Sequence, residues 1–151
     1  MELSGGLIDG VKHFEGLRLV PYYCPTGHLT IGYGHLCDAD QKTISAEEAE
    51  EMLIEDLDYA ARRLLIYSPI LASEPQCRIE ALASWVYNLG LGAYKGSTLK
   101  KRVDAGQWDA ATEEIVRWVY GTVDGEKKKL PGLVRRRAWE AQVFSTGNYR
   151  L

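Results

Sequence analysis

The sequence lacks any long apolar run. None of its hydrophobic stretches reaches the roughly 18–20 residues that a helix needs to cross a bilayer. The first residues, Met1 to Gly6, carry no basic segment followed by an apolar core, so no signal peptide is visible. We therefore expect no stable membrane insertion. We also expect the chain to stay in the cytoplasm where it is made until another protein releases it.

Cysteine is scarce. The three cysteines, Cys24, Cys37 and Cys77, cannot all pair with one another, and no CxxC spacing suggests a zinc site. We expect free thiols in a reducing cytoplasm, no metal and no cofactor. A disulfide between Cys24 and Cys37, or between Cys37 and Cys77, formed after release into an oxidising space, is left open.

Internal repeats, low-complexity tracts and Pro/Ser-rich linkers are missing as well. A chain of 151 residues without a linker suits one domain, or two small lobes that share a core. The hydrophobic fraction of 46% and the charged fraction of 26% are ordinary for a globular protein, so disorder along the whole chain is excluded. We expect residues 1–151 to form a single domain that works as a monomer.

The net charge of −3 is unevenly spread along the chain. Residues 1–94 hold six basic and fourteen acidic side chains, a net −8, whereas residues 95–151 hold twelve and seven, a net +5. A basic C-terminal part attracts polyanions, such as nucleic acid, teichoic acid or an anionic cell wall. The sign of the charge alone does not choose among them.

An amphipathic helix is predicted over residues 3–15. Its apolar positions recur at the spacing of one helix face, and Gly16 is a plausible stop. Glu15 then lies on the last turn, where the helix dipole disfavours a negative charge. The apolar positions are Leu3, Leu7, Ile8, Val11 and Phe14.

A small antiparallel sheet is predicted next, where prolines, tyrosines and glycines punctuate residues 17–36. Residues 29–33 are typical of a short strand that follows a turn over 25–28. Ser45 and Glu48 form a capping box for a long helix over about 46–66.

The remaining pattern is helical, with helices expected over about residues 73–89, 97–106, 108–119 and 133–144. Together, these elements predict an α+β fold with a small N-terminal lobe over about residues 15–45. The helix over 46–66 connects this lobe to a helical lobe over about 70–151, which also takes the helix over 3–15. A cleft between two lobes is a common place for a substrate.

Glu15, Cys24 and Thr30 are the candidate catalytic residues. Glycoside hydrolysis needs a proton donor for the leaving oxygen and a second group that activates water or attacks the sugar directly. A carboxyl at a helix C-terminus, beside apolar residues, is suited to hold the proton. Cys24 and Thr30 follow nine and fifteen residues later, on the turn and strand expected to face Glu15.

Three collinear groups of residues closely resemble the phage lysozyme (endolysin) family, glycoside hydrolase family 24. That family has Glu, eight residues, Asp or Cys, five residues and then Thr, which is the spacing of Glu15, Cys24 and Thr30. The matching residues are Glu15 to Leu19, Tyr22, Gly27 and Thr30 to His35, then Ala81-Leu82, Tyr87 to Gly90 and Ser97 to Leu99, and finally Gly132-Leu133, Arg136-Arg137 and Glu140.

The resemblance implies a lysozyme-like fold and a muramidase that hydrolyses the β-1,4 bond between N-acetylmuramic acid and N-acetylglucosamine. It makes Glu15 the general acid, and Thr30 the residue that holds the attacking water or contacts the sugar. Cys24 stands where many members carry Asp. A thiol accepts a proton only as thiolate, with an ordinary pKa of roughly 8.5. Three roles of Cys24 are left open: base or stabiliser, covalent nucleophile, or a steric role.

Further positions follow from the same resemblance. Leu36, Tyr87, Asn88 and Ser97 match cleft-lining positions, and we expect them to bind the saccharide. Arg136 matches an arginine that approaches the catalytic glutamate. Bacterial peptidoglycan is then the partner, and an endolysin of this kind needs a holin for release from the host cytoplasm to the periplasm and cell wall, where it lyses the host cell.

Three other functions are compatible with parts of the sequence. A lytic transglycosylase needs a single acid and no water-activating partner, so the Cys24 and Thr30 pair disfavours it. A non-catalytic wall-binding protein has no need of Glu15. A nucleic-acid binder is suggested by the basic runs at 127–129 and 135–137, but no nucleic-acid motif accompanies them, and we expect no nucleic-acid partner.

Overall fold

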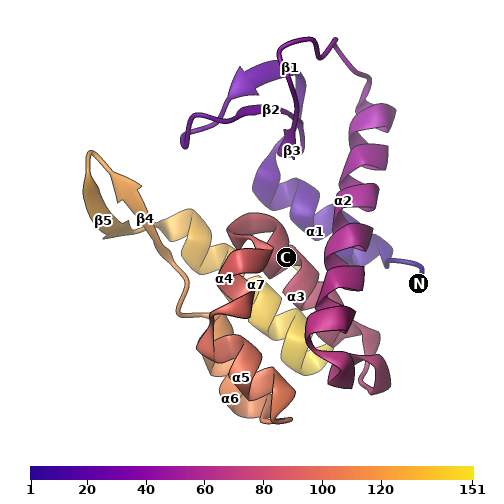
Figure 1. Ribbon diagram of the computed structural model, residues 1–151, viewed down its shortest axis with the longest axis vertical. Helices are drawn as coiled ribbons and strands as arrows, with labels where there is room; N and C mark the ends of the chain where they lie inside the picture. The colour runs from indigo at the N-terminus through magenta and orange to yellow at the C-terminus, as the bar shows by residue number, and fades with distance from the viewer. The chain divides into compact units, whose positions relative to one another are not determined.

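The computed structural model describes all 151 residues, which group into two compact units. Unit 1 is Met1–Tyr59 and unit 2 is Ala60–Leu151, so the boundary falls inside the long helix α2 (Ala46–Tyr67), which is labelled in Figure 1. No helix combines the length and apolar character that spanning a membrane requires. That all residues form one lysozyme-like domain stays a prediction, and each unit is described by itself.

Unit 1 begins with helix α1 (Gly5–Glu15), close to the predicted range of 3–15. The Ser4 hydroxyl caps it by accepting a hydrogen bond from the backbone N–H of Leu7 at 3.3 Å. Gly16 ends it with a φ of +74°, a conformation that glycine adopts without steric cost. The prediction that Glu15 lies on the last turn is therefore confirmed.

The predicted antiparallel sheet has three strands, β1 (Arg18–Tyr23), β2 (Leu29–Gly32) and β3 (His35–Leu36), in that spatial order. Tyr22 lies opposite Thr30 on one side of β2, and Leu36 lies opposite Thr30 on the other. The register between β1 and β2 shifts between Arg18 and Tyr22, which marks a bulge. Thr30, on the central strand β2, thus lies between Tyr22 on β1 and Leu36 on β3.

Helix α2 starts at the predicted capping box. The Ser45 hydroxyl accepts from the backbone N–H of Glu48 at 3.1 Å, and the Glu48 carboxylate accepts from the backbone N–H of Ser45 at 3.2 Å. The first turns of α2 pack on the sheet through Ala49, which joins a small apolar core with Ile31 and Ile44. This core fixes β2, and with it Thr30, to the helix.

Unit 2 is helical except for one hairpin (Figure 1). The predicted helices over 73–89, 97–106 and 133–144 are confirmed as α3, α5 and α7, while α4 was not predicted. The elements after α2 are the 3₁₀ helix η1 (Pro69–Ser73), α3 (Gln76–Leu89), α4 (Leu91–Lys95), α5 (Thr98–Asp104), α6 (Trp108–Ile115), β4 (Tyr120–Val123), β5 (Glu126–Lys129) and α7 (Pro131–Thr146).

Helix α3 is the centre of unit 2. Every residue from Ile79 to Val86 is buried, so the helix is covered on all sides rather than on one face. It packs mainly against α7, and Trp85 stacks edge-on against Tyr94 with ring centroids 6.3 Å apart. Gly90, with a φ of +97°, ends α3 directly after Asn88 and Leu89.

The prediction of one helix over 108–119 was wrong beyond Ile115. Helix α6 ends at Ile115, and residues 120–129 form the hairpin of β4 and β5. Asp124 and Gly125 have φ values of +52° and +78°, the left-handed conformations that a two-residue hairpin turn requires. The backbone N–H of Leu130 closes the base of the hairpin by donating to the Val119 carbonyl at 2.9 Å.

Candidate active site

The turn between β1 and β2 holds Cys24 at its first position. The backbone N–H of Cys24 donates to the His28 carbonyl at 2.9 Å, and the backbone N–H of Gly27 donates to the Cys24 carbonyl at 2.8 Å. Gly27 has a φ of +85°, which L side chains rarely adopt. These two hydrogen bonds and the glycine fix the backbone that carries the Cys24 thiol.

The Cys24 thiol is surrounded by hydroxyl groups. Its Sγ lies 3.0 Å from the Oγ1 of Thr26, and the hydroxyl of Thr30 also interacts with it. The hydrogen bond with Thr26, assisted by backbone N–H groups and by Thr30, lowers the pKa of Cys24 from its ordinary range to about 6. Hydrogen bonds to the charged form have this effect, so the thiolate is the main form at pH 7.

Thr30 is buried on β2, with 3% of its side chain exposed. Its hydroxyl donates to the His28 carbonyl at 2.9 Å, the same carbonyl that accepts from the Cys24 backbone. Thr30 and Cys24 are therefore tied to one peptide group at the end of the turn.

Tyr22 links the predicted catalytic residues of unit 1. It lies opposite Thr30 across the two strands. Burial raises the pKa of Tyr22, and the negative charges of Glu15 and Cys24 raise it further. Glu15, at the end of α1, and Cys24, after β1, are therefore both near enough to Tyr22 to interact with it electrostatically. Tyr22 is thus the residue of unit 1 that interacts with Glu15 and Cys24 and pairs with Thr30, while the catalytic roles of these three residues stay a prediction.

Leu36 and three residues of unit 2 were predicted to bind the saccharide. Leu36 is 66% exposed and lies beside Thr30 on β3. Tyr87 and Asn88 lie half-buried in the last turn of α3, and the side-chain carbonyl of Asn88 is buried without a hydrogen-bond partner. An unsatisfied buried acceptor is costly, and a ligand hydroxyl would satisfy it.

Ser97 has a structural function in unit 2. Its hydroxyl accepts from the backbone N–H of Lys100 at 3.0 Å and donates to the Tyr94 carbonyl at 2.7 Å, so it is the N-cap of α5. The side chain is 4% exposed. Its binding of a saccharide stays a prediction.

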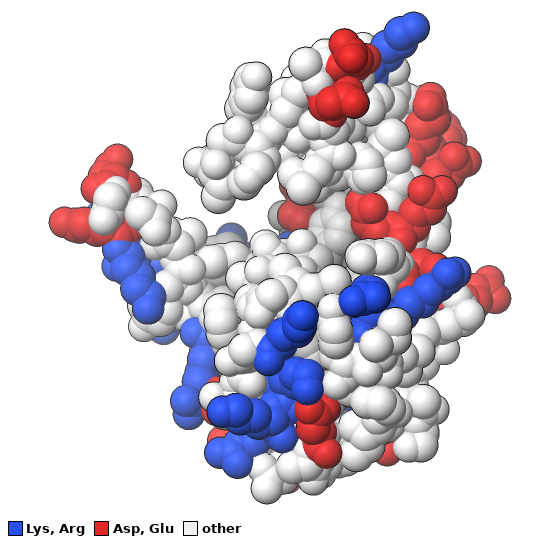
Figure 2. Space-filling model, in the orientation of Figure 1, with Lys and Arg blue, Asp and Glu red and all other residues white.

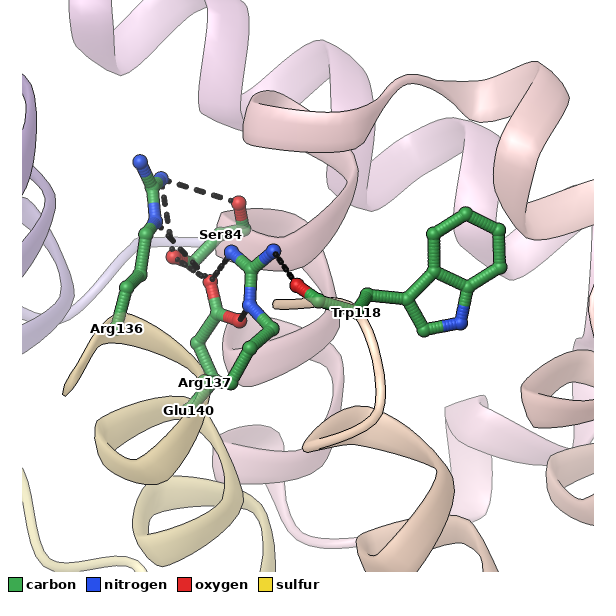
Figure 3. A network of polar contacts seen from close by, with 5 residues as sticks. All are labelled: Ser84, Trp118, Arg136, Arg137 and Glu140. Atoms are coloured by element: carbon green, nitrogen blue, oxygen red, sulfur yellow. Dashed lines mark hydrogen bonds and ion pairs between the residues drawn. The ribbon is translucent and has the colours of Figure 1, made fainter. Parts of the chain in front are cut away.

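Arg136 is 3% exposed in unit 2 and belongs to the polar network of Figure 3. Its guanidinium donates to the Ser84 carbonyl at 3.2 Å and lies 3.3 Å from the Glu140 carboxylate. Arg137 forms an ion pair of 2.6 Å with the same carboxylate and donates to the Trp118 carbonyl at 3.4 Å. The network joins α3 to α7, and its proposed influence on Glu15 stays a prediction.

Sequence reasoning missed Thr26 and His28. The Oγ1 of Thr26 lies 2.9 Å from the Nδ1 of His28, so a chain of polar atoms runs from the Cys24 sulfur through the Thr26 hydroxyl to the imidazole. The signal in the sequence is the alternation of Cys24, Thr26 and His28 around Gly27, which places polar side chains at every second residue of a turn.

Comparisons with known proteins place this chain among endolysins. The family model described as phage lysozyme matches residues 12–140. The endolysin of Acyrthosiphon pisum secondary endosymbiont phage 1 is 36% identical over 137 residues, which cover 90% of this chain and 92% of that protein.

Solved structures of similar fold support the same family. An endolysin from Escherichia coli O157:H7 phage FAHEc1 has a TM-score of 0.83 at 33% identity, covering 100% of this chain and 98% of that one. The muramidase domain of SpmX from Asticaccaulis excentricus has a TM-score of 0.83 at 30% identity, covering 96% and 98%. The predicted α+β lysozyme-like fold is confirmed, and the predicted endolysin function agrees with the names of these proteins. The chain belongs to the phage lysozyme family.

Proposed function

We propose that this protein is an endolysin that hydrolyses the β-1,4 bond between N-acetylmuramic acid and N-acetylglucosamine in bacterial peptidoglycan. Membership of the phage lysozyme family supports a glycoside hydrolase that acts on the cell wall. The observation that carries the proposal is the turn that ties Cys24 and Thr30 to the His28 carbonyl, with Glu15 and Cys24 both near enough to Tyr22 to raise its pKa. A proton donor and a second polar group near one another are what this reaction needs.

Glu15 is the proposed general acid, which protonates the glycosidic oxygen as the bond breaks. It is half-buried at the C-terminal end of α1, where the partial negative charge of the helix opposes a second negative charge. Proton transfer by a positioned side chain contributes roughly 10²–10⁴-fold to a rate.

Cys24 is the proposed second group, with Thr30 beside it. At neutral pH the sulfur carries a negative charge, because the hydrogen bond with Thr26 lowers its pKa to about 6. A thiolate here can accept a proton from water or stabilise positive charge on the sugar, and we favour this role. Attack of the sulfur on the anomeric carbon is the alternative, and it would leave a glycosyl group on Cys24 that intact-protein mass spectrometry detects.

Saccharide binding is assigned to Leu36, Tyr87, Asn88 and Ser97. The unpartnered carbonyl of Asn88 supports a hydrogen bond from a sugar hydroxyl, and the exposed Leu36 supports an apolar contact. Arg136 is proposed to act on Glu15, as the family resemblance implies. Release by a holin, action as a monomer, and residence in the host cytoplasm before the protein reaches the periplasm and cell wall stay proposals of the same origin.

The products made from purified peptidoglycan test this function. Mass spectrometry of the wild type should find reducing muramic acid ends. Glu15→Gln, which keeps the shape of the side chain but removes the acidic carboxyl proton, should lower their yield by about 10²–10⁴-fold. Glu51→Gln, an exposed glutamate on α2, is the matched control and should keep wild-type activity.

Two results would overturn the proposal. Anhydro-muramic acid ends would identify a lytic transglycosylase, because that reaction closes the sugar on itself instead of adding water. Absence of soluble products from a folded wild-type protein would identify a non-catalytic wall-binding protein on the lysozyme fold.

A further inference from the structure

We propose that Cys24, Thr26 and His28 form a proton relay in which His28 takes the proton of the Cys24 thiol through the Thr26 hydroxyl. Thr26 and His28 are then positioning residues that keep the sulfur as a thiolate. The catalytic value of the relay rests on the proposed function of Cys24. The relay itself is a property of the turn and is measured without any substrate.

The distances support a continuous chain of hydrogen bonds. The sulfur of Cys24 lies 3.0 Å from Thr26 Oγ1, and that oxygen lies 2.9 Å from His28 Nδ1. A threonine hydroxyl has one proton to donate and two lone pairs to accept with. It can therefore accept from one neighbour while it donates to the other.

Two protons move together in the proposed transfer. Before transfer, the Cys24 S–H donates to Thr26 Oγ1, and the Thr26 O–H donates to His28 Nδ1. The S–H bond then breaks and its proton joins Oγ1, while the original hydroxyl proton joins Nδ1. The result is a thiolate, an unchanged hydroxyl and an imidazolium, with no oxidant or reductant involved. Imidazole suits this role because it takes up protons between about pH 5 and 8.

The side chains of Cys24, Thr26 and His28 form exposed hydrogen bonds, and the backbone of the turn keeps them next to one another. The His28 carbonyl accepts from the Cys24 backbone and from the Thr30 hydroxyl, both at 2.9 Å. These bonds fix the two ends of the turn to each other. Thr26, two residues from each end, then has both partners within reach at little further cost in entropy.

The other charges near the thiol do not replace the relay. Tyr22 on β1 is the titratable neighbour that interacts electrostatically with Cys24, and burial raises its pKa, so it is neutral at pH 7. Glu15 acts on that same phenol, and the Arg18 guanidinium lies 5.4 Å from its ring centre. On β2, Thr30 contributes a neutral hydroxyl. His28 is the imidazole that the Thr26 hydroxyl joins to the thiol.

Alkylation of Cys24 by iodoacetamide, followed against pH by peptide mass spectrometry, tests the relay. The reagent reacts with the thiolate, and Cys37 and Cys77 in the same protein serve as internal references. We expect a midpoint for Cys24 near pH 6 in the wild type. Thr26→Val and His28→Gln should each move it toward the ordinary value of about 8.5 and slow alkylation at pH 6.5 by about tenfold.

Two control variants separate the relay from a structural role. Thr26→Ser restores a hydroxyl at the same position and should return the midpoint to the wild-type value. Thr43→Val removes an exposed hydroxyl elsewhere in unit 1 and should leave the alkylation of Cys24 unchanged. Circular dichroism of each variant checks that the fold is retained.

The relay is overturned if His28→Gln leaves the alkylation profile unchanged, even where Thr26→Val shifts it, since the hydroxyl alone would then hold the thiolate. Activity on peptidoglycan is read separately. A shifted profile with unchanged hydrolysis supports the relay and removes Cys24 from the proposed mechanism. An unchanged profile with activity lost in Glu15→Gln removes the relay and leaves the proposed function standing.

Discussion

A thiol at position 24 sets the pH at which the proposed site works. The thiolate forms as the pH rises through about 6, because the hydrogen bond with Thr26 and the backbone N–H groups favour the charged sulfur. A base that acts in its deprotonated form gains activity over the same interval. An aspartate, the residue of many family members here, is deprotonated at a lower pH.

Cys24→Asp should therefore move the rising limb of the pH profile toward acid. We expect the limb of kcat/KM on soluble glycan fragments to shift from about pH 6 to about pH 4, the ordinary range of an aspartate. Cys24→Ser has no titratable group at this position and should lose both the limb and most of the activity. A limb that stays at the wild-type pH in Cys24→Asp would show that another group is responsible for it.

At the scale of single residues, spacing along the chain predicted the candidates that chemistry requires, but not the residues that support them. Glu15, Cys24 and Thr30 were proposed because their residue types suit glycoside hydrolysis and their intervals match those of the phage lysozyme family. Thr26 and His28 were missed because a side-chain hydrogen bond within a turn depends on backbone angles such as the φ of +85° at Gly27. Asn88 was found from the family resemblance, but its unpartnered carbonyl is visible only in the structure.

At the scale of elements, the buried carboxylate of Glu140 joins α3 to α7 (Figure 3). It accepts from Ser84 on α3 at 2.5 Å and lies between the guanidinium groups of Arg136 and Arg137 on α7. All four side chains are buried. Two buried positive charges are tolerated only while the negative charge between them is present.

Glu140→Gln removes that charge and keeps the size of the side chain. We expect the free energy of unfolding to fall by about 3–5 kcal/mol, which urea denaturation followed by tryptophan fluorescence measures. Glu113→Gln, an exposed glutamate on α6, should change it by less than about 0.5 kcal/mol. A loss below about 1 kcal/mol in Glu140→Gln would mean that other groups neutralise the two arginines.

The ends of helices were predicted correctly where a capping residue or a glycine sets them. Ser45 and Glu48 form the expected capping box, and Gly16 ends α1 as expected. The helix over 108–119 was extended too far because its apolar spacing continues beyond Ile115. The Asp124-Gly125 turn was the signal for the hairpin, but the strand of Glu126 to Lys129 is fully polar and shows no alternation that would mark a strand.

At the scale of the whole molecule, the two compact units carry opposite charge. Unit 1 has three basic and twelve acidic residues, a net −9, whereas unit 2 has fifteen and nine, a net +6. Figure 2 shows acidic side chains gathered over α2 and basic ones over the helices and hairpin of unit 2. The sequence predicted this asymmetry, but the point where it divides became clear only with the units, because the acidic residues of α2 all precede the boundary whereas Arg62 and Arg63 follow it.

The basic unit should draw the enzyme to anionic cell walls. If so, raising the salt concentration should slow the lysis of whole cells more than the hydrolysis of short soluble fragments, because screening acts on the long-range attraction and not on the bond-breaking step. The comparison is made between roughly 0.02 and 0.3 M salt, over which the screening length falls from about 20 to about 6 Å. Turbidity of intact cells and release of reducing ends from fragments are the two measurements.

The hairpin provides the matched variant for this prediction. Lys127, Lys128 and Lys129 are exposed on β5, and replacing all three with glutamine removes half of the net charge of unit 2 without touching its buried helices. We expect this variant to lyse cells more slowly at low salt, to depend less on salt, and to hydrolyse fragments at the wild-type rate. Equal salt sensitivity of cells and fragments in the wild type would remove wall attraction as the function of the positive charge. A hairpin variant that slows both reactions equally would instead place these lysines in substrate binding itself.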